Sequence, residues 1–308
     1  MEAPDGRGAA GPYGRVMSAL RTSNPSPLVT TTVADAMRRG VITCAPDSDL
    51  AAVAATMASN AIHAAVLLAP DRSGALVVSD LDVIRAALAG DYDRTAAEIA
   101  REPMATVVAS APLQQAVALM AKRDDSHVLV SEPGVAWPVG VLSSLDVMSV
   151  LSGRKPALTR VIRPAPARPL VSATALRDTT VEAVMHPGVV TSLPDDGLEQ
   201  LAGTMADLRM HCVAVVGAGR RHDGDEHLVW GLVTDMDVLH AAYRGAEATR
   251  AADVAATSPL ALPEDAGLDR AAALMTAHDA THVVVVDRGG TPAGVVSTLD
   301  VLRIVAAG

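Results

Sequence analysis

The chain has 308 residues, a formal net charge of −10 at neutral pH and no phenylalanine, and half of its residues are apolar. Large cores can therefore be buried, but valine, leucine, alanine and methionine must fill them. The acidic balance, without a basic stripe interleaved with aromatic residues, argues against a nucleic-acid partner. Two cysteines cannot form a disulfide framework, and no signal peptide or apolar run of about 18 residues is found. We therefore expect a cytoplasmic protein without a membrane span.

The chain contains an internal duplication. Residues 31–63 match residues 179–211 at fifteen of 33 positions without a gap, at an offset of 148. Residues 95–127 match residues 250–282 at an offset of 155, and the seven extra residues fall in the loop after position 216. The unit that duplicated was therefore a pair of repeats, so the chain holds four.

Each repeat follows the same order of expected elements. A short β-like segment comes first, and the four are Val41–Thr43, Thr106–Val108, Val189–Thr191 and Leu260–Leu262. Next comes an amphipathic helix with apolar residues at i, i+3, i+4 and i+7, beginning at Leu50, Leu113, Leu198 and Leu268. A β-rich run, a turn, a further strand and a second helix complete the repeat. The fold class is therefore α+β, with four β-α-β-β-α repeats in two tandem modules.

Composition divides the chain into further segments. Residues 1–28 hold four prolines and four glycines without periodicity and are predicted to be a disordered tail. Residues 154–177 hold four prolines, six basic residues and no acid, which predicts a linker. The first module is expected at 29–153 and the second at 178–308. Their repeats are expected at about 31–90, 95–153, 179–245 and 250–308.

One nonapeptide recurs in all four repeats. The copies are "LVVSDLDVI" from Leu76, "GVLSSLDVM" from Gly140, "GLVTDMDVL" from Gly231 and "GVVSTLDVL" from Gly294. A hydroxyl residue followed three places later by an acid predicts a capping box at a helix N-terminus. The same N-terminus can bind phosphate, and a carboxylate there can accept hydrogen bonds from ribose hydroxyls. Glycine at the strand end allows close approach of another backbone or a ligand.

With these motifs the four units resemble cystathionine-β-synthase (CBS) domains over roughly residues 30–153 and 178–308. The resemblance implies two modules, each with a pseudo-two-fold axis and two clefts that bind adenine nucleotides or related adenosyl compounds. It also implies a regulatory role toward a protein partner and association into flat dimers. It assigns the ligand contacts to Ser79 and Asp82, Ser143 and Asp146, Thr234 and Asp237, and Ser297 and Asp300, beside Gly140, Gly231 and Gly294.

The resemblance extends the site to two further sets of residues. An apolar slot for adenine falls at Ile42, Ala105, Val190 and Leu260. The junction before the second strand, where the family often places phosphate-binding basic residues, carries His63, His127, His211 and His282. A purely structural interpretation is that these histidines end helices favourably. Leu76 replaces glycine in the first repeat, so the Ser79–Asp82 site is expected to be the weakest.

We find no catalytic motif and no zinc signature, so we expect neither enzymatic activity nor a catalytic cofactor. The loop "RRHDGDEH" lacks the ligand spacing of a metal site and is interpreted as a solvated loop. The leading hypothesis is a sensor that binds AMP, ADP, ATP or an adenosyl compound and acts on an unidentified protein target, with a homodimer compatible with the sequence. One alternative is a ligand-free scaffold. Another is a protein of the same repeats that binds a cyclic dinucleotide, or a divalent metal together with a nucleotide.

Overall fold

The computed structural model describes residues 26–68, 75–100, 104–154, 174–220, 226–246, 249–255 and 259–307. The expected tail, most of the linker and much of the loop around residues 220–227 lie outside these residues. Every helix in the described ranges is too short or too polar to cross a bilayer.

The four repeats contain the expected β-α-β-β-α order. Repeat 1 comprises β2 (Thr43–Cys44), α3 (Leu50–Asn60), β3 (Ala64–Leu68), β4 (Ala75–Ser79) and α4 (Asp80–Ala89). Repeat 2 comprises β5 (Thr106–Val108), α6 (Leu113–Arg123), β6 (His127–Ser131), β7 (Gly140–Ser143) and α7 (Ser144–Leu151). Repeat 3 comprises β9 (Thr191–Ser192), α10 (Leu198–Leu208), β10 (Cys212–Arg220), β11 (Glu226–Thr234) and α11 (Asp235–Tyr243). Repeat 4 comprises β12 (Ala261–Pro263), α13 (Leu268–Ala277), β13 (His282–Val286), β14 (Pro292–Ser297) and α14 (Thr298–Ala307).

Short elements precede the repeats and were not predicted. The helices are α1 (Pro27–Thr30), α2 (Val33–Ala36), α5 (Ala96–Ile99), α8 (Thr174–Asp178), α9 (Val181–Val184) and α12 (Ala251–Val254). Two edge strands, β1 (Arg38–Arg39) and β8 (His186–Pro187), follow α2 and α9. The sheet of repeat 2 has the order β1-β7-β6-β5 and that of repeat 4 has the order β12-β13-β14-β8. The first repeat of each module thus lends a strand to the sheet of the second.

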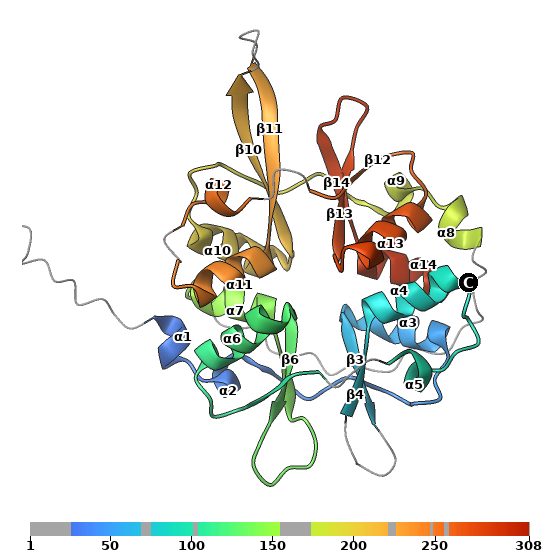
Figure 1. Cartoon of the computed structure of the whole chain (residues 1–308), viewed down its shortest axis with the longest axis vertical. Coiled ribbons are helices and arrows are strands. Elements are labelled where there is room, and N and C mark those ends of the chain that lie inside the picture. The colour runs from blue at the N-terminus through green and yellow to red at the C-terminus, as the bar shows by residue number, and fades with distance from the viewer. Residues whose placement is uncertain are drawn as a thin grey trace, which may run out of the picture.

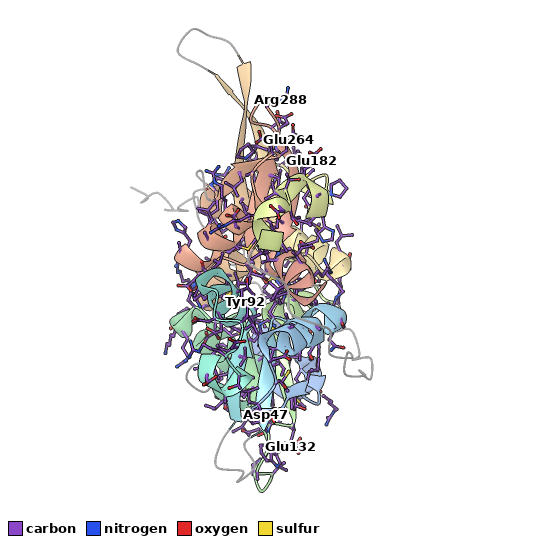
Figure 2. The ribbon with its side chains drawn as sticks, turned by 90° about the vertical axis from the view of Figure 1, so that its right-hand side faces the viewer. Asp47, Tyr92, Glu132, Glu182, Glu264 and Arg288 are labelled. Carbon is purple, nitrogen blue, oxygen red and sulfur yellow. The ribbon has the colours of Figure 1, made fainter. Side chains whose placement is uncertain are left out.

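The two repeats of a module lie side by side, and the two modules stack end to end along the long axis (Figures 1 and 2). Within a module the sheets meet through small clusters, such as Val66, Val77 and Leu129. Across the modules the helices pack together, with α7 on α10 and α3 on α14. Repeat 2 therefore faces repeat 3, and repeat 1 faces repeat 4.

The main hydrophobic cores cross the boundary between the modules. One core joins repeats 2 and 3 and includes Leu113, Met148 and Met205, which are fully buried. The other joins repeats 1 and 4 and includes Leu50, Met57 and Met275, which are also fully buried. The leucine and methionine positions of the four amphipathic helices supply much of both cores. The sequence predicted those helix faces, but it did not show that each packs against the other module.

Candidate ligand sites and a central histidine cluster

The hydroxyl residue and the aspartate of the nonapeptide form a capping box at the N-terminus of the second helix of a repeat. Ser79, Ser143 and Thr234 cap α4, α7 and α11, each through its own hydroxyl and the carboxylate three residues later. In the fourth repeat, Ser297 donates from its backbone N–H and its Oγ to Asp300 Oδ2, at 2.9 and 2.7 Å. At all four sites one carboxylate oxygen is engaged by the cap, as the spacing predicted.

The other carboxylate oxygen has a different partner in different repeats. Asp146 Oδ1 accepts from Arg38 Nε at 3.2 Å. Asp300 Oδ1 pairs with Arg303 and lies 3.3 Å from His186 Nε2. Asp82 Oδ1 lies 3.4 Å from Arg85 Nη1. Within the described part of the chain, Asp237 Oδ1 has no such partner, so Asp237 is the carboxylate with most remaining capacity to accept from a ligand.

A pocket of about 410 Å³ lies at the Asp146 site, on the boundary between the modules. Arg38 and Asp146 line it from the first module, and Asp207 and Arg209 line it from the second. Its volume falls within the range of about 300–1,000 Å³ that is typical of small-molecule sites. Of the predicted site residues, Asp146 lines this pocket, whereas Ser143, Ala105 and His127 of the same repeat do not.

The glycines of the nonapeptides have a structural role of their own. A Cβ atom at Gly294 would lie 2.6 Å from Met185 Sδ and 2.7 Å from the His186 carbonyl oxygen. A Cβ atom at Gly140 would clash with the carbonyl oxygen of Arg38 in the same way. The edge strands β8 and β1 therefore require these glycines, whether or not a ligand binds. Leu76 lies on β4, which pairs with β3, and is 39% exposed.

The positions expected to form an adenine slot are equivalent in all four repeats. Ile42, Ala105, Val190 and Leu260 are half-buried. The carbonyl oxygen of each accepts a backbone N–H bond of 2.9 Å from the following strand, donated by Val66, Leu129, Ala214 and Val284. These bonds hold the first segment of each repeat beside its sheet, and the four side chains stay only partly covered.

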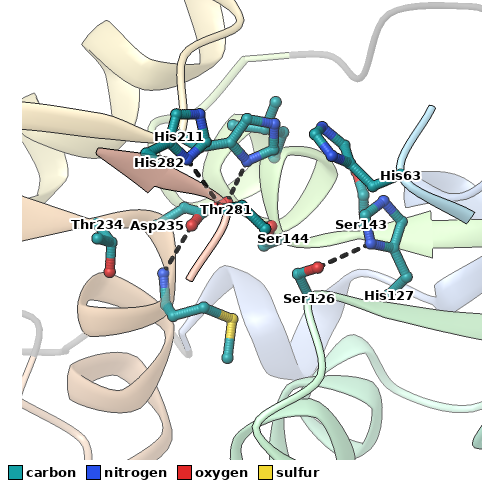
Figure 3. Close-up of polar contacts among 12 residues, drawn as sticks. His63, Ser126, His127, Ser143, Ser144, His211, Thr234, Asp235, Thr281 and His282 are labelled. Carbon is teal, nitrogen blue, oxygen red and sulfur yellow. Dashed lines mark hydrogen bonds and ion pairs between the residues drawn. The ribbon is translucent and has the colours of Figure 1, made fainter. Parts of the chain in front are cut away.

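The four predicted histidines come together at the centre of the molecule, although they belong to four different repeats (Figure 3). Their rings form a chain, with centroid separations of 6.0 Å for His127–His63, 5.0 Å for His63–His211 and 5.4 Å for His211–His282. The sequence placed these residues at equivalent positions. It did not show that the positions meet.

Two buried aspartates divide the cluster and were missed by the sequence analysis. His211 Nδ1 lies 2.6 Å from Asp235 Oδ2, which also accepts from Ser144 Oγ at 2.6 Å. His63 Nδ1 lies 2.7 Å from Asp80 Oδ2, which also accepts from Thr298 Oγ1 at 2.5 Å. Each aspartate therefore links its own repeat to a hydroxyl of the facing module. The sequence did contain a signal for this pairing. The first residue of the second helix is an aspartate in repeats 1 and 3, at Asp80 and Asp235, and a hydroxyl residue in repeats 2 and 4, at Ser144 and Thr298.

The other two histidines bond to hydroxyl groups. His127 Nδ1 lies 2.8 Å from Ser126 Oγ, and His282 Nδ1 lies 2.8 Å from Thr281 Oγ1. Burial and the neighbouring charges of His63 and His211 lower the pKa of His127 and of His282 to about 3. Burial alone would also lower the pKa of His63, but the bond to Asp80 and its charge outweigh that effect and raise it. The centre thus holds two neutral imidazoles, and a phosphate there would meet fewer positive charges than four histidines suggest.

The arrangement defines a class of protein: a ring of four α+β repeats with capped helix N-termini that are candidate ligand sites. A model of the CBS domain family matches residues 33–89, 96–153, 181–244 and 251–307. The chain therefore belongs to the CBS domain family, and the predicted family and fold are confirmed.

Solved structures give more distant similarities. A Methanocaldococcus jannaschii protein described as an archaeal homologue of γ-AMPK is 15% identical, with a TM-score of 0.38, covering 89% of this chain and 99% of that one. A CBS domain pair in complex with 5′-methylthioadenosine and S-adenosyl-L-methionine is 19% identical, with a TM-score of 0.35, covering 41% and 94%. A Vibrio cholerae protein described as an acetoin utilization protein is 25% identical, with a TM-score of 0.35, covering 41% and 89%. The comparison with curated proteins gave no match.

Metal ligands are not grouped in the described ranges: no three His, Cys, Asp or Glu side chains there could hold a metal ion. Cys44 and Cys212 are buried free thiols. Burial, followed by the charge of Asp235, raises the pKa of the Cys212 thiol to about 12. A protonated, buried thiol is unreactive, so Cys212 acts as a small apolar residue.

Proposed function

We propose that this protein is a regulatory sensor that binds adenine nucleotides or related adenosyl compounds, without catalysis, and transmits the binding to a protein partner. The observation that carries the proposal is the pocket at the N-terminus of α7. It combines a buried carboxylate at Asp146, in the first turn of α7, with the guanidinium groups of Arg38 and Arg209. This donor set suits a ligand with both hydroxyl and phosphate groups.

The position of the pocket supports a regulatory role. It lies between α7 of the first module and α10 of the second, so a ligand contacts both modules at once. A ligand that binds one arrangement of the modules better than another shifts the population toward that arrangement. A partner that recognises the module boundary would then respond to the ligand.

Thermal unfolding of the full chain with AMP, ADP, ATP or adenosine tests this function. A ligand present at 100 times its Kd and bound only by the folded state adds about 2.7 kcal/mol to the free energy of unfolding. Native mass spectrometry of the purified protein would identify any compound that remains bound. Stabilisation by none of these ligands, together with an empty native mass spectrum, would reject the proposal.

A ligand-free scaffold is the second candidate, and a specific observation favours it. The carboxylates of Asp146 and Asp300 already use both oxygens, for the cap and for an ion pair. Gly140 and Gly294 are required by neighbouring strands. These four motif residues therefore have structural roles that need no ligand. Unchanged oligomeric state and partner binding in an Asp146→Ala variant that folds would support the scaffold.

A further inference from the structure

The first long helix of each repeat is followed by a residue with the same unusual backbone shape. Among the described residues, the non-glycine positions with positive φ are Ala61 (48°), Asp124 (57°), Arg209 (52°) and Asp279 (49°). Asparagine and aspartate tolerate this left-handed conformation best. The backbone is thus common to all four repeats, whereas the side chain is neutral, acidic or basic.

Three of these residues, Asp124, Arg209 and Asp279, reach across the boundary between the modules. Asp124 follows α6, which packs on α11, and its Oδ1 lies 3.0 Å from His240 Nε2. Asp279 follows α13, which packs on α4, and pairs with Arg85. His240 and Arg85 each lie one turn after the capping aspartate of their helix. The residue after the long helix of one module therefore covers a candidate site of the other.

Arg209 occupies the same place at the Asp146 site. It lines the pocket beside Asp146 and Ser149, and Ser149 is the counterpart of His240 and Arg85. Arg38 pairs with Asp146, and Arg154 Nη2 donates to Asp207 Oδ2 at 2.6 Å. Among the described residues, Arg209 has no carboxylate partner. The pocket thus holds three guanidinium groups against two carboxylates.

The surroundings of Arg209 favour an incoming anion. Burial and the like charge of Arg38 lower the pKa of the Arg209 guanidinium, and the charge of Asp146, which already pairs with Arg38, offsets this lowering only in part. Guanidinium groups bind phosphate through charge-assisted hydrogen bonds that are stronger than neutral ones. A phosphate between Arg38 and Arg209 would relieve their repulsion.

The Asp237 site has the opposite charge. Asp237 and Asp124 bring two carboxylates, and His240 is the facing base among the described residues there. A phosphate would be repelled, whereas Asp237 Oδ1 can still accept from the hydroxyl groups of an uncharged ribose.

We propose that this left-handed residue selects the ligand of the site it covers. Arg209 makes the Asp146 site specific for phosphate-bearing ligands, and Asp124 restricts the Asp237 site to nucleosides without phosphate. The assignment of ribose and adenine to these sites rests on the proposed function.

Calorimetric titration of the full chain with inorganic pyrophosphate, ATP and adenosine tests the assignment. Arg209→Asp places at this position a residue already accepted at 124 and 279, and it should weaken pyrophosphate and ATP binding about tenfold or more. Adenosine affinity should stay within about twofold, since no phosphate is involved. Asp124→Arg should add one pyrophosphate site. Arg288→Asp makes the same charge change at the outer end of the second module and should have little effect (Figure 2).

The outcomes separate the two proposals. Equal losses in Arg209→Asp and Arg288→Asp would mean a general charge effect and overturn the selection by Arg209, as would equal losses for adenosine and pyrophosphate. Wild-type protein that binds pyrophosphate through Arg209 but never adenosine contradicts the adenosyl sensor and leaves the anion site standing. Wild-type protein that binds neither probe contradicts both.

Discussion

The first and second repeats of each module differ at the residue that opens the second helix. Repeats 1 and 3 have Asp80 and Asp235 at this position, and repeats 2 and 4 have Ser144 and Thr298. Across the module boundary, each aspartate accepts a hydrogen bond from one of these hydroxyls. The pattern therefore teaches that the duplicated unit was a complementary pair, in which acid and hydroxyl were already assigned to different repeats.

The same difference sets the hydrogen-bond partners of the histidines. Burial would raise the pKa of the Asp235 carboxyl, but the charge of His211 and its hydrogen bond keep that pKa low. The hydrogen bond and charge of His63 keep the pKa of the Asp80 carboxyl low in the same way. Among the described residues, His127 and His282 bond to hydroxyl groups, and their lowered pKa values keep them neutral. The four equivalent histidines thus have two kinds of partner, a carboxylate for His63 and His211 and a hydroxyl for His127 and His282.

Loss of one central carboxylate should have the largest effect on this comparison. Asp235→Ala leaves His211 and Ser144 without their shared acceptor in a buried site, and breaking such a pair costs about 3–5 kcal/mol of unfolding free energy. Urea unfolding followed by circular dichroism would measure the loss. The matched Ser144→Ala variant removes only the hydroxyl and should cost about 0.5–1.5 kcal/mol. An equal loss of unfolding free energy in the two variants would mean that the Asp235 carboxylate and the Ser144 hydroxyl contribute alike to stability.

The edge strands provide a second distinction between the repeats. Gly140→Ala introduces a Cβ atom against the Arg38 carbonyl, and such overpacking should cost about 1–3 kcal/mol. Leu76→Ala, at the corresponding and more exposed position of repeat 1, should cost less than about 1 kcal/mol. Both values follow from urea unfolding. A larger loss in Leu76→Ala would contradict the conclusion that β1 needs a residue without a Cβ atom at position 140.

The smallest effect, counted per pH unit and per histidine, should appear on acidification. His127 and His282 have pKa values of about 3 in the folded protein, below the unfolded value of about 6.5, so the unfolded chain binds protons first as pH falls. The free energy of unfolding is therefore unaffected by these two histidines above about pH 6.5. It falls as pH drops from about 6.5 toward 3, by about 1 kcal/mol per pH unit for each histidine. In contrast, the raised pKa of His63 stabilises the fold below pH 6.5 and loses its effect as pH rises.

Unfolding free energies at pH 6.5, 5.5 and 4.5 would measure this slope, since the central aspartates stay charged in that range. The double variant His127→Gln with His282→Gln should have a shallower slope than wild type. His278→Gln changes an exposed histidine after α13 and should keep the wild-type slope. A wild-type slope in the double variant would contradict the assignment of two neutral histidines.

Much of the fold could be predicted because repetition made local signals reliable. The four long helices begin at the expected leucines, and the capping boxes form at the expected spacing. The strands β1 and β8 were missed because "RR" and "HP" are too short to give a period. The inter-module cores were missed because an amphipathic face indicates burial but does not name its partner.

The candidate sites were predictable only in part. The motif placed Asp82, Asp146, Asp237 and Asp300 at helix N-termini, and their role in ligand binding stays a prediction. Arg38 and Arg209 could not be assigned to the Asp146 pocket, because they lie 108 positions before and 63 positions after that residue. Contacts between repeats carry this information, and a period in one sequence does not reveal which copies face each other.

The cores shared between modules have a consequence for how the chain folds during synthesis. The helix α3 is made early, but its packing partner α14 is the last helix of the four repeats. Until α14 emerges, the apolar face of α3 with Leu50 and Met57 lacks its cover. Domains usually fold in order from the N-terminus, and exposed apolar surface in intermediates promotes aggregation. Repeats 2 and 3, which are adjacent in the chain, can complete their shared core first and hold the remaining two until the ring closes.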